Sequence, residues 1–385
     1  MQHISKQQTP KFSLGIEEEY WIVDKKSNNL IQNAPKEFLQ RLKSEFRDQV
    51  TNEFLQSQVE IGTSPNVSID KTLDELKVFR GTISFIANKY DMDVFAASTH
   101  PFADYRRQKV TEKRRYSQLA NDLQEIANRM LICGMHVHIG LDDNDLKIDL
   151  MNQMIYFLPH ILALTTSSPF YGARDTGLLS YRLSIFDNIP RTGLPSQFNS
   201  WNEYQKFLEL LIATQTLEDG SKIWWDIRPN ANWPTLEVRI CDICTNVADT
   251  VAIASLIRCI FRFLYRMKTK NTKWRVYPNS LIGENRWRAQ RYSFLEEDGL
   301  HLIDFGVAQS VNYSNLIDQL IEVIADDISF YECQEQIDHI RSITKRGTSA
   351  NIQKQIYYKN ILQGSTNKEA LFEVVEWLKA ETISF

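Results

Sequence analysis

The sequence predicts a mixed α+β fold, and two kinds of pattern carry that prediction. Several short segments alternate apolar and polar residues, as half-buried strands do, and longer segments between them place apolar residues at helical spacing. The strand-like segments are spaced irregularly, so the regular alternation of a parallel α/β fold is not supported. With 385 residues and 43% apolar content, the chain can bury a large core.

The first expected strand covers residues 11–24, where Leu14, Ile16 and Tyr20 alternate on one face. Further strands are expected at 93–98 and 131–140. Two more, at 222–228 and 235–242, are separated by a turn rich in proline and asparagine.

Helices are expected at 68–90, 150–165, 200–217 and 247–267, with one more at the C-terminus. Pro159 should kink the second of these or set its end. Ser200 and Glu203 have capping-box spacing, as do Thr366 and Glu369 at the start of the last helix. Segments 170–197 and 275–294 are expected to be arginine-bearing loops. Because no linker or repeat divides the chain, one catalytic domain is expected over 11–385.

Composition narrows the choice of partners and compartment. The chain has 44 basic and 48 acidic residues, a net charge of −4, so a nucleic-acid partner is not expected. Residues 1–10 are polar and unlike a secretory signal, and the apolar stretch 154–164 is too short to span a membrane. Five cysteines, an odd number, fit free thiols in the cytoplasm. A homodimer is left open.

Glu17 and Glu19 are the first candidates for chemistry. Two positions apart in a strand, they point to the same face. Adjacent carboxylates repel each other unless a cation lies between them, and oxygen ligands suit Mg²⁺. The alternative is an exposed edge strand with solvated acids.

Two further strand pairs follow the same spacing. His136 and His138 share one face of their strand, which suggests ligands open to a substrate, although hydrogen-bonded core histidines or half of a zinc site would look alike. Glu237 and Arg239 also share a face, and they suit either a reaction site or a structural ion pair across the sheet.

Glu53 and Glu60 lie seven positions apart, which would put them on opposite faces of one strand. Either only Glu60 joins the site, or a turn or bulge intervenes. The arginines of the two expected loops suit bidentate recognition of phosphate or carboxylate, although a solvated basic loop is the alternative. The candidates among them are Arg182, Arg191, Arg286, Arg288 and Arg291.

Together these motifs resemble the bacterial carboxylate–amine ligase family, also called glutamate–cysteine ligase type 2. The matching stretches run in order from residue 14 to residue 353: LGIEEEYWIVD, EFLQSQVEIGT, GMHVHIG, PRTGLPSQFNSWNEY, SKIWWDIRPN, TLEVRICD, ENRWRAQRY and RGTSANIQ. Each motif is weak alone, but eight in the right order make a specific match covering nearly the whole chain.

The resemblance implies a glutamine-synthetase-type catalytic fold, shared with guanidino kinases, in which a curved antiparallel sheet forms a funnel with helices outside. It implies ATP- and Mg²⁺-dependent joining of a carboxylate, expected to be glutamate, to an amine such as cysteine through an acyl phosphate. The implied metal ligands are Glu17, Glu19, Glu60, His136, His138 and Glu237.

In the same resemblance Arg239 contacts the transferred phosphate, Glu53 is a further catalytic candidate, and Arg182, Arg286, Arg288 and Arg291 contact ATP or a substrate carboxylate. The absence of a serine or cysteine nucleophile signature agrees with this chemistry. Two alternatives are kept: a guanidino-kinase-like phosphotransferase, and a nucleotide- or metal-binding protein without catalysis.

Overall fold

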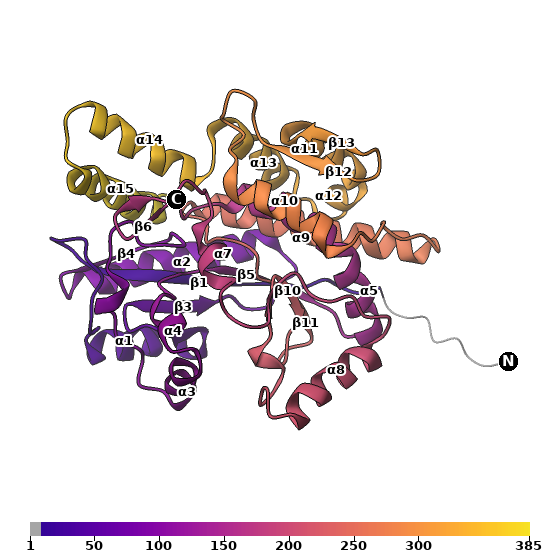
Figure 1. The fold of residues 1–385 in the computed structure, drawn as a ribbon, viewed down its shortest axis with the longest axis horizontal. Helices are drawn as coiled ribbons and strands as arrows, with labels where there is room; N and C mark the ends of the chain where they lie inside the picture. Colours follow the sequence, from indigo (N-terminus) through magenta and orange to yellow (C-terminus); the bar gives the residue numbers. More distant parts are fainter. Residues whose placement is uncertain (1–8) are drawn as a thin grey trace.

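The computed structural model describes residues 9–385, apart from the side chain of Arg115 (Figure 1). One seven-stranded sheet lies at the centre of this part of the chain. Its strands are β1 (Leu14–Asp24), β2 (Val50–Asn52), β3 (Gln58–Gly62), β4 (Met92–Phe95), β5 (Met135–Gly140), β10 (Ile227–Pro229) and β11 (Thr235–Val238). The strand order is β10-β11-β5-β1-β3-β2, with β4 paired to the C-terminal half of β1, and all pairings are antiparallel.

Six short strands form three separate pairs: β6 (Phe170–Tyr171) with β7 (Arg174–Asp175), β8 (Thr192–Gly193) with β9 (Trp224–Trp225), and β12 (His301–Asp304) with β13 (Gln309–Asn312). The helices of the first half are α1 (Lys36–Phe46), α2 (Ile69–Asn88), α3 (Arg114–Leu123), α4 (Glu125–Asn128), α5 (Asn144–Met154), α6 (Leu158–Thr165) and α7 (Tyr181–Phe186). Those of the second half are α8 (Trp201–Ala213), α9 (Val247–Thr269), α10 (Asn279–Arg291), α11 (Tyr313–Val323), α12 (Ala325–Tyr331), α13 (Gln334–Arg346), α14 (Ser349–Leu362) and α15 (Asn367–Thr382).

The side chains of β1 alternate so that one face of the sheet is apolar and the other is polar. Leu14, Ile16 and Tyr20 are buried on the face against which α2 and α9 pack, and α9 is buried along most of its length. In Figure 1, α10 to α13 gather on one side of the sheet and α3 and α8 on the other. Helix packing thus covers one face and leaves the other free to line a site. The predicted α+β class with an antiparallel sheet is confirmed.

Two of the expected helix starts are confirmed by their caps. The Ser200 hydroxyl accepts a hydrogen bond from Glu203 N (3.2 Å) at α8, and Thr366 with Glu369 forms a full capping box at α15. Segment 150–165 is instead two helices joined by the 3₁₀ turn Ile155–Phe157, and Pro159 lies in the first turn of α6. Proline is tolerated there because the first helical N–H groups have no partner within the helix.

The expected loop 275–294 is wrong, because most of it is helix α10. The buried stripe of α10 includes Asn285, Arg286 and Gln290 beside Ile282 and Ala289. Since polar residues occupy the buried positions, hydrophobic periodicity could not reveal the helix. The other expected loop, 170–197, likewise contains helix α7 and three short strands.

Among the described residues, no helix combines the length and the apolar character needed to cross a membrane. The five cysteines are free and buried, as expected for thiols. Residues 1–8, which carry most of the segment judged unlike a secretory signal, lie outside the described part of the chain. A cytoplasmic location, the homodimer and the single domain over 11–385 stay predictions.

Candidate active site

The polar face of the sheet forms one wall of a cavity of about 400 Å³, a volume typical of small-molecule sites. Eight of the twelve predicted site residues line it: Glu17, Glu19, Glu53, Glu60, His136, Arg182, Glu237 and Arg239. His138 joins them through its contact with Glu17.

Cross-strand register explains how such distant residues meet. Glu17 of β1 is opposite His136 of β5, and Glu19 is opposite Glu60 of β3. Glu237 of β11 is opposite His138. Directly opposed residues in a sheet project to the same face, so the three pairs form one polar surface.

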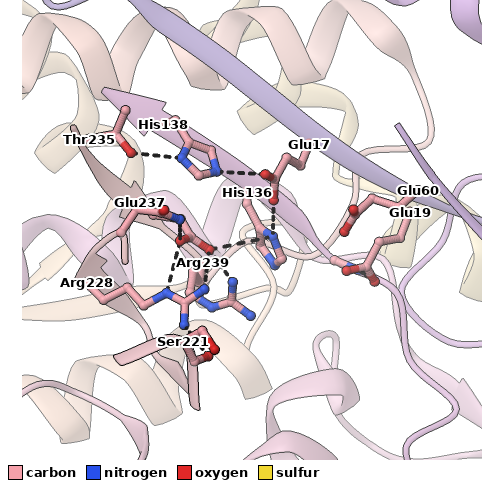
Figure 2. Close-up of polar contacts among 12 residues, drawn as sticks. Glu17, Glu19, Glu60, His136, His138, Ser221, Arg228, Thr235, Glu237 and Arg239 are labelled. Atoms are coloured by element: carbon pink, nitrogen blue, oxygen red, sulfur yellow. Dashed lines mark hydrogen bonds and ion pairs between the residues drawn. The ribbon is translucent and has the colours of Figure 1, made fainter. Parts of the chain in front are cut away.

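One candidate metal group consists of Glu17, His138 and Glu237, whose ligand atoms lie within 4.8 Å of one another. Figure 2 shows these side chains converging from three neighbouring strands. Glu17 Oε2 lies 3.0 Å from His136 Nδ1, and Glu17 Oε1 lies 3.2 Å from His138 Nε2. His138 Nδ1 is 3.0 Å from the Thr235 hydroxyl, which orients the ring so that Nε2 faces the carboxylates.

A second group consists of Glu19, Glu53 and Glu60, again with ligand atoms within 4.8 Å of one another. Of the two expected alternatives, the turn between Glu53 and Glu60 is the one present, because β2 ends at Asn52 and β3 begins at Gln58. Gly134 N donates to Glu19 Oε2 (2.8 Å), and the Thr51 hydroxyl donates to Glu60 Oε1 (2.8 Å). The hairpin therefore brings Glu53 beside two carboxylates that the sheet already opposes.

The two groups differ in their protonation. Burial and the charge of Glu60 raise the pKa of Glu19 to about 7, and burial with the charges of Glu53 and Glu17 raises the pKa of Glu60 well above its usual range. Burial would also raise the pKa of Glu237, but Arg239 and Arg228 outweigh it and hold that pKa well below its usual range. In the second group, burial and mutual repulsion thus outweigh the charges of Arg182 and Arg239 at Glu19 and favour protonated carboxyls when no cation is bound.

The histidines also differ. Burial and the charge of Arg239 lower the pKa of His136 to about 4, so its ring is neutral near pH 7. Burial opposes the charged form of His138 as well, but its pairing with Glu17 outweighs burial and raises that pKa. The two carboxylate oxygens of Glu17 thus meet two different imidazoles, and those contacts lower its own pKa although burial acts in the other direction.

Three arginines border the acids. Arg228 forms a bidentate pair with Glu237 (3.0 and 3.2 Å), and Arg239 also contacts Glu237 through Nη1. Arg182, on α7, donates through Nη1 and Nη2 to the Arg239 carbonyl (both 3.3 Å). The Nε atoms of Arg182 and Arg239 are buried and have no hydrogen-bond partner among residues 9–385. Each guanidinium group therefore keeps a donor that this part of the chain leaves unpaired.

The donor set fits divalent cations. Carboxylate oxygens are the ligands that Mg²⁺ prefers, and an imidazole nitrogen can complete a set of this kind. His138 Nε2 is buried and lies 3.2 Å from Glu17 Oε1, but it has no hydrogen-bond partner among the described residues. A cation at Glu17, His138 and Glu237 would satisfy that nitrogen, and one at the second group would neutralise its clustered charge.

Three predicted residues lie elsewhere. Arg286, Arg288 and Arg291 are on α10, and none of them is among the described residues that line the cavity. Arg286 is paired with Asp187 and Asp226, and Arg288 with Glu284 one helical turn away. Arg291 lies 4.0 Å from Glu296.

Sequence-based prediction did not select Arg228 as a site residue. It also missed Asn230, whose Nδ2 donates to Glu237 Oε2 (2.6 Å), and Thr51. The alternation from Trp224 to Arg228 was a usable signal for Arg228, since that strand precedes the Glu237 strand in a hairpin. Nothing in the sequence marked Asn230 or Thr51, because their role depends on register.

Comparison with known proteins identifies the family of this chain. Residues 13–355 match the family described as glutamate-cysteine ligase family 2. The chain belongs to this family. Two curated relatives carry the name "Putative glutamate--cysteine ligase 2": one from Rhodospirillum rubrum is 46% identical over 379 residues, covering 97% of this chain and 96% of the relative, and one from Jannaschia sp. is 45% identical, covering 95% and 96%.

Two solved structures have the same fold as this member of glutamate–cysteine ligase family 2. One is a glutamate–cysteine ligase from Francisella tularensis in complex with AMP, with a TM-score of 0.68, 13% identity, and coverage of 97% of this chain and 89% of that one. The other is a bifunctional glutathione synthetase from Pasteurella multocida, with a TM-score of 0.68 and 15% identity. The match covers 96% of this chain but 52% of that enzyme, so the chain spans about half its length. Family membership supports a ligase.

Proposed function

We propose that this protein joins a carboxylate to an amine with ATP and Mg²⁺, through an acyl phosphate. The observation that carries the proposal is the meeting of two metal-ligand groups and Arg239 in one cavity. A carboxylate is a poor electrophile, so an enzyme that forms an amide without a covalent nucleophile has to activate the carboxylate. Transfer of the γ-phosphoryl group of ATP to the carboxylate would do so, with ADP as the leaving group.

In this proposal Glu17, His138 and Glu237 hold one Mg²⁺, and Glu19, Glu53 and Glu60 hold another. When bound, such ions would offset the negative charge that moves during phosphoryl transfer. His136 positions Glu17 through their 3.0 Å contact. Glu53 stays a candidate catalytic residue beside the second group.

Arg239 and Arg182 are the proposed contacts to the transferred phosphate. Both line the cavity next to the acids, and each keeps a buried Nε–H that no described residue accepts. Guanidinium donors fixed before the reaction stabilise the charge that develops on the phosphoryl oxygens, because they need not reorient. Arg286, Arg288 and Arg291 are not included in this proposal, since they do not line the cavity.

The carboxylate substrate is proposed to be glutamate and the amine cysteine, because relatives of this family are named for that reaction. The test is a screen of acid–amine pairs for ADP formation with Mg²⁺. We expect ADP only when both substrates are present, and the amide as the second product. ADP formation with an amine or guanidine alone, with a phosphorylated amine as product, would contradict the ligase and favour a phosphotransferase.

The acyl phosphate has its own test. With ATP labelled at the β–γ bridging oxygen, the carboxylate alone should allow reversible transfer, and the label should scramble into nonbridging positions of the β-phosphate. Adding the amine should suppress scrambling by diverting the intermediate to product. Scrambling without any carboxylate would exclude this route.

A further inference from the structure

The backbone around Arg239 is held from two sides by two different parts of the chain. On one side, the Asp226 carbonyl accepts hydrogen bonds from Arg239 N (2.8 Å) and Ile240 N (3.1 Å). On the other side, the Arg182 guanidinium donates to the Arg239 carbonyl. Asp226 lies between β9 and β10, and Arg182 lies on α7. The position of Arg239 therefore depends on how these two parts lie relative to each other.

Arg286 joins those two parts. Its Nε and Nη2 donate to the Asp226 carboxylate (2.7 and 3.2 Å), and its Nη1 and Nη2 donate to the Asp187 carboxylate (2.6 and 2.8 Å). Asp187 directly follows α7, the helix that carries Arg182. One guanidinium from α10 thus makes a double contact with each of the two elements that hold Arg239.

The Arg286–Asp226 part of this cluster is buried, whereas the Asp187 side chain is 36% exposed. The Asp226 side chain is 2% exposed and that of Arg286 10% exposed. Only a planar fork with donors on two edges can pair bidentately with two carboxylates, and a lysine ammonium cannot. In a site that transfers phosphate, a misplacement of about 1 Å can cost roughly 100-fold in rate.

We propose that Arg286 is a positioning residue for Arg239, acting through Asp226 and through the Asp187 end of α7. This inference rests on the proposed function, in which Arg239 contacts the transferred phosphate. It gives Arg286 a role outside the cavity, in place of the direct contact with ATP or a substrate carboxylate that the sequence suggested.

The first test compares Arg286→Lys with Arg266→Lys. Arg266 is the matched control, because it pairs bidentately with a fully buried carboxylate, Asp327, in joining α9 to α12. Arg286→Lys should lower kcat about 10- to 100-fold and change the KM for ATP by less than about threefold. Arg266→Lys should lower thermal stability comparably and leave kcat unchanged. Equal kcat losses in both variants would reduce Arg286 to a stabilising ion pair and overturn the proposal.

The second test is a double-mutant cycle. If Arg286 acts through Arg239, then Arg239→Lys combined with Arg286→Lys should be no slower than Arg239→Lys alone, within about twofold. Multiplying losses would overturn the inference. If Arg239→Lys keeps full turnover, both the proposed role of Arg239 and this inference are wrong. If Arg239→Lys is slow but Arg286→Lys is fully active, only this inference is wrong.

The third test needs no turnover. Hydrogen exchange of the Arg239 and Ile240 amides should be faster in Arg286→Lys than in the wild type and in Arg266→Lys, because those amides bond to Asp226. If Arg286→Lys fails to fold, the double variant Asp226→Asn with Arg286→Met takes its place, because it leaves no unpaired charge within that pair. Its amides at positions 239 and 240 should also exchange faster than those of the wild type. Unchanged exchange at both amides would show that Arg286 does not fix this backbone.

Discussion

Arg80 Nη2 lies 2.6 Å from Glu18 Oε1, and both side chains are fully buried. Glu18 stands between two acids of the candidate site, yet it faces the opposite side of β1, where it also accepts a hydrogen bond from the Thr250 hydroxyl (2.7 Å). Arg80 is on α2 and Thr250 is on α9. Glu18 therefore joins two helices to the sheet, while its neighbours Glu17 and Glu19 line the cavity.

Removing Arg80 should destabilise the fold. Arg80→Met leaves Glu18 buried without its cation, which costs about 3–5 kcal/mol, a large share of typical total stability. Urea unfolding measures the change. Arg106→Met is the control, because its pair with Asp104 is mostly exposed and should contribute about 0–1 kcal/mol. If the two variants unfold at the same urea concentration, the Glu18–Arg80 pair has no structural role.

Stability should fall as the solution is acidified from pH 6.5 towards pH 4, partly through His100. Burial lowers the pKa of His100 to about 4, its Nδ1 accepts from Phe102 N and Ala103 N, and its Nε2–H donates to Asn28 O. Between these pH values the unfolded chain binds a proton that the folded chain does not, so protonation favours unfolding.

The shift from 6.5 to about 4 corresponds to roughly 3 kcal/mol. Chemical denaturation at pH 5 and pH 7 measures the effect, and His100→Gln should show a smaller difference between the two pH values than the wild type does. If the variant loses as much unfolding free energy between pH 7 and pH 5 as the wild type does, His100 does not contribute.

Cation binding should weaken as the pH falls below 7. The Glu19 carboxyl has a pKa of about 7 in the cation-free protein, and a cation at its group has to displace that proton. Affinity should therefore drop about tenfold per pH unit for each displaced proton. Calorimetric titration with Mg²⁺ at pH 6, 7 and 8 tests this. Glu19→Gln should bind more weakly and with less dependence on pH; the same slope in both proteins would count against Glu19 as a ligand.

Arg239→Lys should slow turnover far more than it weakens ATP binding. A lysine cannot reproduce the bidentate fork on phosphoryl oxygens, and the loss of one such contact in the transition state is worth about 100- to 1,000-fold in rate. Steady-state kinetics gives kcat, and direct titration gives ATP affinity. A lysine variant with wild-type turnover would assign Arg239 to the structural ion pair with Glu237.

Gly134→Ala should displace Arg182 from the cavity. A Cβ at Gly134 would lie 2.6 Å from Arg182 Nη2, closer than real contacts allow. Because Arg182 also bonds to the Arg239 carbonyl, we expect kcat to fall about 10- to 100-fold. Gly283→Ala is the control, since its Cβ would meet nothing within 4 Å, and it should keep full turnover. Normal activity in Gly134→Ala would show that Arg182 can shift without consequence.

Part of the site was predictable because it depends on local geometry. The side-chain period of a strand put Glu17 with Glu19, His136 with His138, and Glu237 with Arg239 on common faces before any tertiary contact was known. The same rule meant that Glu53 and Glu60 could both join the site only across a turn or bulge, and the hairpin of β2 and β3 provides the turn. The helix caps at Ser200 and Thr366 were readable for the same reason.

Other features depend on contacts between residues far apart in the sequence. The alternation of β1 could not show that Glu18 is buried, because its partner Arg80 lies 62 positions later. Helix α10 looked like a basic loop because its buried face is largely polar, and those polar groups are satisfied by distant residues such as Asp187 and Asp226. By itself, the sequence determined which side chains share a strand face, since that follows from backbone period. Only the tertiary structure decided which faces meet and which arginines reach the cavity, since register and packing choose each charge's partner.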